Sequence, residues 1–288
     1  MINLKKIQSE KPIKDLLSFS IINIDKPSNP TSFTVSQFVR KVLNLSKSSH
    51  FGTLDPQVSG VLPVALNRAC RLNEYLMHRD KTYVGIMRLH KEISIEELKK
   101  IITKFTGKIT QLPPIRSNVK RAPRQREVQF FTILEKEDKD ILFETKVQAG
   151  TYIRTICDNI GKEIGGAHML ELRRTQAGIF SESESYTLYD FEKAVLEYYN
   201  GSEKLLRKML IPGEIVSTLY PVIETESEFI KKAHSGSPIF EKYLKPKSPL
   251  KSLNKDDKIC LFSDNQFLGI YKYDPRNEII ATPEFVFN

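Results

Sequence analysis

The chain has 288 residues, of which 44 are lysine or arginine and 35 are aspartate or glutamate, so its net charge is +9. Hydrophobic residues make up 40% of it and are spread throughout, which excludes wholesale disorder. No apolar run approaches the roughly 18 residues of a membrane span, and the N-terminus lacks the apolar segment of a signal peptide, so we expect a soluble, intracellular protein.

Four segments carry the i, i+3, i+4 spacing of apolar residues that predicts an amphipathic helix. They are 35–43, with Ser32 or Thr34 as the candidate N-cap; 98–105, between Ser94 and Gly107; 153–164, ending at Gly165; and 191–198. We interpret each apolar stripe as a face that packs on the core.

Runs rich in β-branched and aromatic residues predict strands at 19–24, 82–89, 127–134 and 141–147, and shorter ones at 258–262, 267–273 and 279–282. Strands and helices do not alternate strictly, and no Gly-x-Gly-x-x-Gly follows a strand. A doubly wound parallel sheet and a nucleotide cofactor therefore lack support, and an α+β fold is expected.

The charge balance changes near residue 212. Residues 1–212 hold 34 basic and 24 acidic residues, whereas residues 213–288 hold 10 and 11. We predict a larger domain at 1–212 and a small β-rich domain at 213–288, with the extension 1–18 packing on the latter. The excess of positive charge in the larger domain favours a polyanionic partner, either nucleic acid or an acidic membrane surface.

The three cysteines, Cys70, Cys157 and Cys260, lie far apart and have no neighbouring ligand spacing. We interpret them as reduced thiols without a metal role.

One acid stands out in the stretch 50–63, where Asp55 is bracketed by Gly52, Pro56 and Gly60. Glycine permits unusual dihedral angles and proline removes backbone freedom, so the pattern predicts a loop of fixed shape that presents a carboxylate. An Asp-Pro pair taken alone is more often a turn or a helix cap.

Arg154 lies where a strand meets the helix predicted from residue 153. The helix dipole disfavours a cation at that end, so a carboxylate or a phosphate is a plausible partner. An ion pair with Asp158, four residues further on, is the alternative.

A basic run without any acid occupies residues 113–126. Its prolines exclude an amphipathic helix and weaken a membrane interpretation, so an extended arm along a phosphate backbone fits better. The candidate RNA-binding residues are Arg116, Lys120, Arg121, Arg124 and Arg126, with Arg173 and Arg174 as a second basic group.

Five motifs in this order and spacing resemble the TruB-type pseudouridine synthases. They are Lys26-Pro27 with Pro30-Thr31-Ser32, Gly52-Thr53-Leu54-Asp55-Pro56 with Gly60-Val61-Leu62-Pro63, Lys81-Thr82-Tyr83, Gly150-Thr151-Tyr152-Ile153-Arg154 and Leu172-Arg173-Arg174. The stretch from Gln111 to Arg121, together with Gly166-Ala167-His168-Met169, is similar to the archaeal branch related to dyskerin, the catalytic subunit of H/ACA ribonucleoproteins. The resemblance covers about residues 19–180. It continues weakly into a PUA-like region at His234-Ser235-Gly236, and Ser49 replaces the family's usual glycine.

The resemblance implies a catalytic domain with a mixed, largely antiparallel sheet and flanking helices, followed by a PUA-like domain. It implies that Asp55 is the nucleophile and that Arg154 keeps it ionised in a partly desolvated pocket. Tyr83 would stack on the uracil and serve as the candidate base, while His50 and Leu172 would hold the flipped nucleotide. Substrate and product are isomers, so no cofactor or metal is expected.

By the same resemblance, the expected activity is guided isomerisation of uridines in ribosomal RNA, and also in transfer RNA, in an archaeal cytoplasm. The implied partners are an H/ACA guide RNA, the substrate RNA and small accessory proteins, with no membrane. A stand-alone transfer-RNA enzyme and an inactive RNA-binding scaffold are the alternatives.

Overall fold

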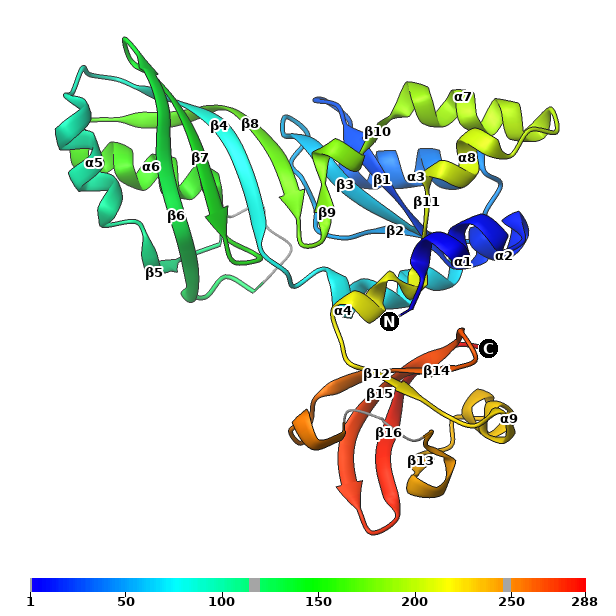
Figure 1. Cartoon of the computed structure of the whole chain (residues 1–288). Coiled ribbons are helices and arrows are strands. Elements are labelled where there is room, and N and C mark those ends of the chain that lie inside the picture. The colour runs from blue at the N-terminus through cyan, green and yellow to red at the C-terminus, as the bar shows by residue number, and fades with distance from the viewer. Residues whose placement is uncertain (1, 114–119, 246–249) are drawn as a thin grey trace. The chain divides into compact units, whose positions relative to one another are not determined.

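A computed structural model describes residues 2–113, 120–245 and 250–288 (Figure 1). The chain forms two compact units, one of Leu17–Leu210 and the other of Met1–Leu16 with Ile211–Asn288. The division lies beside residue 212, where the charge balance changes.

The larger unit is built on one mixed sheet whose strands follow the order β10-β1-β3-β8-β4-β7-β6-β5, with β2 paired to β3 and β9 to β8. Only the β1–β10 and β3–β8 pairs of this path are parallel, so the sheet is largely antiparallel, as predicted. The strands are β1 (Ser20–Lys26), β2 (Ser48–His50), β3 (Ser59–Leu66), β4 (Lys81–Leu89), β5 (Gly107–Gln111), β6 (Arg124–Glu137), β7 (Asp140–Val147), β8 (Ala167–Ala177), β9 (Phe180–Ser181) and β10 (Tyr186–Thr187), with β11 (Leu210–Pro212) at the division between the units.

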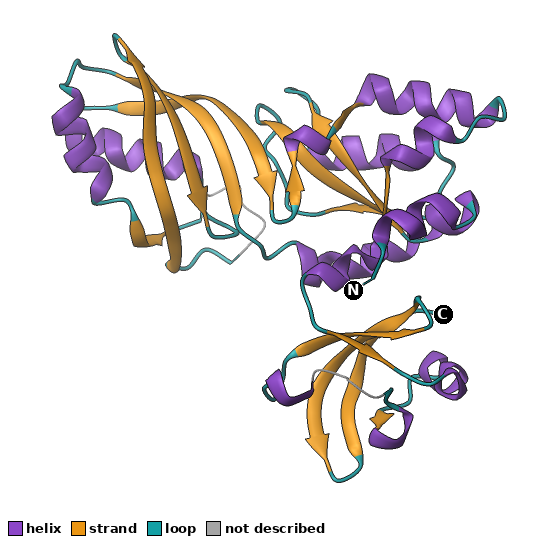
Figure 2. Cartoon of the chain, in the orientation of Figure 1, coloured by secondary structure: helices purple, strands orange, loops and turns teal. Residues whose placement is uncertain are grey.

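Helices flank this sheet (Figure 2). They are α3 (Ser32–Val42), α4 (Asn73–Leu76), α5 (Ile95–Thr103), α6 (Ile153–Ile164), α7 (Leu188–Tyr199) and α8 (Lys204–Met209), while α2 (Ile13–Ser18) spans the division between the two units. Thr31, rather than Ser32 or Thr34, caps α3, because the helix begins three residues before its apolar stripe. Ser94 caps α5, and Gly165 ends α6 in the left-handed conformation, both as predicted.

The main core lies between α5, α6 and the central strands β4, β6, β7 and β8. Leu54 and Val58 belong to the same buried cluster, although they come from the loop between β2 and β3. These two side chains flank Asp55 and therefore fix its loop to the core.

Two stretches differ from the sequence-based expectation. The segment 50–63 is not one loop, because residues 59–66 form β3. Pro63 therefore lies inside a strand, opposite Asn23 of β1. The apolar run after Gly60 buries both faces of this strand, which hides the alternation that marks a half-buried one. Residues 167–177, to which no element was assigned, form β8.

The smaller unit contains a five-stranded sheet of order β12-β14-β15-β16-β13. Its elements are α1 (Leu4–Glu10), β12 (Val222–Glu224), α9 (Ile230–His234), β13 (Ile239–Phe240), β14 (Lys258–Ser263), β15 (Gln266–Arg276) and β16 (Ile279–Val286). Lys11 Nζ lies 2.7 Å from Glu214 Oε1 and 5.9 Å from the ring centroid of Phe287. These contacts join the N-terminal segment to the C-terminal part of the unit. In the described residues, no helix is both long and apolar enough to cross a membrane.

Candidate active site

The loop that carries Asp55 is held at its backbone while the Asp55 side chain stays exposed. The Ser32 hydroxyl accepts from Leu54 N at 2.8 Å and donates to Leu54 O at 3.0 Å. Asp55 O accepts from Val58 N at 3.0 Å and closes a tight turn around Pro56. The loop therefore presents a carboxylate from a fixed backbone, as the glycine and proline pattern predicts.

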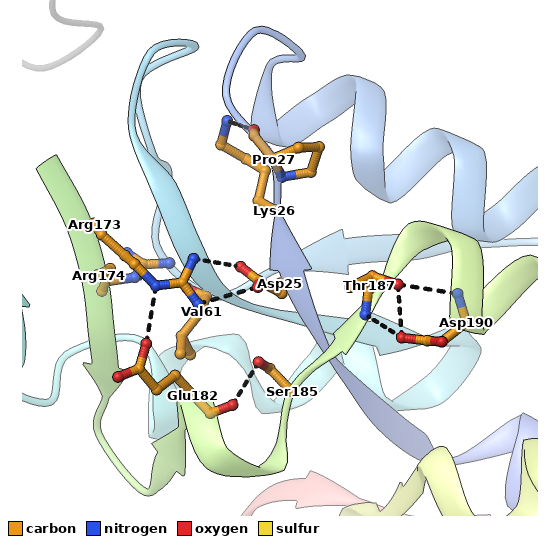
Figure 3. Close-up of polar contacts among 10 residues, drawn as sticks. All are labelled: Asp25, Lys26, Pro27, Val61, Arg173, Arg174, Glu182, Ser185, Thr187 and Asp190. Atoms are coloured by element: carbon orange, nitrogen blue, oxygen red, sulfur yellow. Dashed lines mark hydrogen bonds and ion pairs between the residues drawn. The ribbon is translucent and has the colours of Figure 1, made fainter. Parts of the chain in front are cut away.

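Lys26 ties this loop to the segment that follows β1. Its ammonium donates to the carbonyl oxygens of Pro27, Pro30 and Pro56 at 2.8, 2.9 and 3.0 Å (Figure 3 shows the first of these bonds). The residue is fully buried. Burial and the neighbouring Arg174 lower the pKa of Lys26, and the nearby Asp55 carboxylate opposes that shift.

Arg154 points at Asp55 from the first turn of α6. Its Nη2 lies 3.2 Å from Asp55 Oδ2, so its ion-pair partner is Asp55 rather than Asp158. The two side chains are 52% and 58% exposed, and a pair of this exposure contributes about 0–1 kcal/mol to stability. The expected desolvation of Asp55 is therefore not found in the chain alone, because water reaches the carboxylate.

Tyr83 and Leu172 line the interior beside this loop. Tyr83 on β4 lies opposite Arg174 on β8, and Leu172 lies opposite Gly85. Tyr83 is 9% exposed and Leu172 is 8% exposed, and both belong to the buried cluster that contains Leu54.

Arg174 is 1% exposed and makes internal hydrogen bonds. Its Nε donates to Val61 O at 2.8 Å and its Nη2 donates to Gly52 O at 3.0 Å. Burial lowers the pKa of Arg174, and its interaction with Tyr83 opposes that shift. The prediction that Arg174 contacts RNA is wrong, because no part of its guanidinium is left at the surface for a phosphate.

Arg173 points to the opposite face of β8, since neighbouring residues of a strand alternate (Figure 3). Its Nη1 and Nη2 lie 2.9 and 3.0 Å from the two carboxylate oxygens of Asp25, and its Nε lies 2.9 Å from Glu182. Two acids already neutralise this guanidinium, so it offers little positive charge to RNA.

A third buried cation, Lys81, completes a cluster with Lys26 and Arg174. Its ammonium donates to the carbonyl oxygens of Met77 and Arg79 at the end of α4. Burial, with a further contribution from Arg174, lowers the pKa of Lys81 to about 8. Both lysines lie in family motifs, but no role could be assigned to them from local pattern, because burial of a lysine is a tertiary property.

His50 ends β2, directly before the loop. Its Nε2 lies 3.2 Å from Thr53 Oγ1, and burial together with Arg174 lowers its pKa. The ring is thus biased towards its neutral form.

Of the predicted basic arm, Arg116 lies outside the described residues. Lys120 and Arg121 are exposed, Arg124 Nη2 donates to Lys120 O at 3.2 Å, and Arg126 is half-buried beside Gly150. Their contact with RNA stays a prediction.

The cysteines carry free thiols, and burial raises the pKa of both Cys157 and Cys260 to about 12. In the described part of the chain, no three His, Cys, Asp or Glu side chains form a group that could hold a metal ion.

Two family models match the chain. A model described as TruB family pseudouridylate synthase, N-terminal domain, matches residues 40–153, and one described as tRNA pseudouridylate synthase B C-terminal domain matches residues 154–217. Together they include the loop of Asp55, Tyr83, Arg154 and Arg174.

Curated relatives are archaeal proteins named probable tRNA pseudouridine synthase B. The protein of Methanopyrus kandleri is 45% identical over 208 residues, which are 71% of this chain and 61% of the relative. That of Archaeoglobus fulgidus is 37% identical over 268 residues, which are 91% of this chain and 81% of the relative. The match thus spans about three fifths of the length of several curated relatives.

Solved structures are similar over nearly the whole chain. A chain of a Cbf5-Nop10-Gar1 complex superposes with a TM-score of 0.87 and 34% identity, covering 98% of this chain and 88% of that one. A chain of an H/ACA ribonucleoprotein bound to a substrate RNA containing 2′-deoxyuridine gives a TM-score of 0.85 and 32% identity, covering 98% and 89%.

Proposed function

This chain belongs to the TruB family of pseudouridylate synthases, and we propose that it isomerises uridine to pseudouridine in RNA. The observation that carries the proposal is the Asp55–Arg154 pair, in which a carboxylate on an anchored loop faces a guanidinium from a helix start at 3.2 Å. Both groups point to solvent, where a flipped nucleotide can reach them.

In the proposed reaction Asp55 acts as the nucleophile. The bond between uracil N1 and ribose C1′ breaks, the base turns, and C5 bonds to C1′ while C5 gives up its proton and N1 gains one. An ionised carboxylate supports attack on C1′, attack on the ring, or loss of a ribose proton as the first step. Arg154 holds that carboxylate in place and stabilises its charge.

Tyr83 is the proposed base for the C5 proton and the surface on which the uracil stacks. It lies opposite the buried Arg174 in the β4–β8 ladder and interacts with it electrostatically, so the oxygen that would accept the proton lies near a buried positive charge. Leu172 and His50 are proposed to hold the nucleotide, Leu172 by apolar contact and His50 through a ring biased towards its neutral form.

For substrate selection we propose a guide RNA, with this chain as the catalytic subunit of an H/ACA-type particle that includes small accessory proteins. The similarity to a Cbf5-Nop10-Gar1 complex and to an H/ACA particle bound to substrate RNA supports this choice. The smaller unit is then proposed to act as a PUA-like RNA-binding domain. The second candidate is direct modification of transfer RNA, which the names of the curated relatives favour.

The test is release of tritium from RNA labelled at uridine C5. Wild type is assayed on a guide-paired target with guide RNA and accessory proteins, and on transfer RNA without them. Release that requires the guide supports the guided function, whereas guide-free release on transfer RNA supports the second candidate.

Three variants test the site itself. Asp55→Asn is expected to abolish release and Arg154→Met to slow it strongly, to a residual rate that single-turnover conditions still measure. Asp158→Asn, on the same helix as Arg154, is expected to leave release unchanged. Activity retained by Asp55→Asn would overturn the nucleophile assignment, and a wild type that binds RNA without releasing tritium would indicate a scaffold.

A further inference from the structure

Gln111, the last residue of β5, hydrogen-bonds the backbone just before α6. Its Nε2 donates to Tyr152 O at 3.1 Å, and its Oε1 accepts from Tyr152 N at 3.0 Å. Gln111 is 3% exposed. One buried amide therefore satisfies both backbone polar groups of a single residue in a different element.

Tyr152 is the N-cap residue of α6, and its side chain makes no capping hydrogen bond to the helix. The position and direction of the first turn thus depend on how the Tyr152 backbone is held. Arg154 follows two residues later, and its pairing with Asp55 is more than half exposed, so packing around the two side chains does little to fix it.

Gln111 is also tied to the basic strand of the predicted RNA contact. It lies opposite Arg124 in the β5–β6 ladder, so the residue that holds Tyr152 is anchored to the strand that bears Arg124 and Arg126. The chain of contacts runs from this strand through Gln111 and Tyr152 to Arg154 and ends at Asp55.

From this geometry we propose that Gln111 is a positioning residue, which sets the start of α6 so that Arg154 reaches Asp55. The inference rests on the proposed function for its catalytic consequence. Its structural part, that Gln111 holds the start of α6, stands independently of any activity.

The test replaces Gln111 with methionine, which keeps the length of the side chain and removes both hydrogen bonds. Gln125→Met, an exposed glutamine on β6, is the matched control. Single-turnover isomerisation and RNA dissociation constants are measured for both variants and repeated in an Arg154→Met background. A misplaced catalytic group costs up to about 100-fold in rate, so we expect a loss of about 10- to 100-fold for Gln111→Met with RNA affinity within about twofold of wild type.

In the Arg154→Met background, the further loss caused by Gln111→Met should fall below about twofold, since two residues that act through one interaction are not additive. Gln111→Glu supplies a conservative variant. Its protonated carboxyl presents one donor and one acceptor to Tyr152, so its rate relative to wild type should rise as pH falls. A full additional loss in the Arg154→Met background, or a pH profile parallel to that of wild type, would overturn the positioning role.

Hydrogen exchange separates this inference from the proposed function. Amides of residues 152–156 should exchange faster in Gln111→Met than in wild type and Gln125→Met, whether or not the protein isomerises uridine. Unchanged exchange there would refute the structural part. Faster exchange in Gln111→Met, together with a wild type that releases no tritium, would refute only the proposed function.

Discussion

The burial of Arg174 yields the sharpest prediction. Arg174→Met keeps most of the side-chain volume but removes the hydrogen bonds to Val61 O and Gly52 O, at 2.8 and 3.0 Å, and the electrostatic interaction with Tyr83. Leaving a buried carbonyl unpaired costs about 1–3 kcal/mol. Removing a buried guanidinium offsets part of this loss, because the charge no longer has to be desolvated.

A net destabilisation of about 2–4 kcal/mol follows from these opposing effects. For a unit of this size each kcal/mol lowers Tm by about 2–4 °C, so a fall of about 5–15 °C is expected in a calorimetric scan. The pKa values of His50 and Lys81 should both rise, because Arg174 lowers each of them.

The matched control is Arg173→Met, one residue earlier on the same strand. Arg173 pairs with two acids and its side chain is 38% exposed, so its loss should cost about 1 kcal/mol or less. Filter binding across a salt series completes the assay. RNA affinity of folded Arg174→Met should stay within about twofold of wild type with an unchanged salt slope. An unaltered Tm together with a reduced slope would refute this reasoning and return Arg174 to the RNA interface.

Three further predictions concern other residues. Gly60→Ala should lower the free energy of unfolding by about 3 kcal/mol or more in urea titrations, because φ is +103° and a Cβ would lie 2.2 Å from Arg174 O. The control Gly201→Ala, with φ of +95° and open space around it, should lower it by only about 1 kcal/mol. Equal losses in the two variants would contradict the predicted clash at Gly60. The pKa of Lys81 is about 8 in the folded protein and 10.5 in the unfolded chain, so between these pH values the unfolded chain holds more protons and stability rises with pH. The urea midpoint of wild type should therefore increase relative to that of Lys81→Met from about pH 8 to about pH 10. Midpoints that change in parallel would argue against a depressed pKa. Replacing Lys120, Arg121, Arg124 and Arg126 with glutamine should weaken RNA binding alike for all sequences and reduce the salt slope by about 1 for each phosphate that is no longer neutralised, and an unchanged slope would remove the basic run from the interface.

Elements with a clear period were predictable from the sequence. The stripe at 153–164 and the glycine after it define α6, and Ser94 marks the start of α5, because caps and periodicity are local properties. The strand β3 was missed for an equally local reason. Its residues are buried on both faces, so the run lacks the alternation by which a half-buried strand is found.

The site divides in the same way. Its residue types and their order along the chain pointed to Asp55, Tyr83 and Arg154, and the glycines and prolines around Asp55 indicated a fixed loop. Local pattern could not choose between Asp55 and Asp158 as the partner of Arg154, because Asp55 is brought to α6 only by the packing of Leu54 and Val58 into the core.

Local structure therefore follows from the sequence alone, and so do the candidate residues for the chemistry, which its family resemblance names. Which arginine side chains remain exposed for binding RNA is decided by how the sheet packs. Arg173 and Arg174 are the same residue type at neighbouring positions, and a strand sends one to each face, but only the tertiary fold shows that Arg174 faces the interior. The sequence suggests Arg174 as an RNA-binding residue, but its burial gives it a structural role. A buried guanidinium needs hydrogen-bond partners inside the protein, and here these are the carbonyl oxygens of Val61 and Gly52.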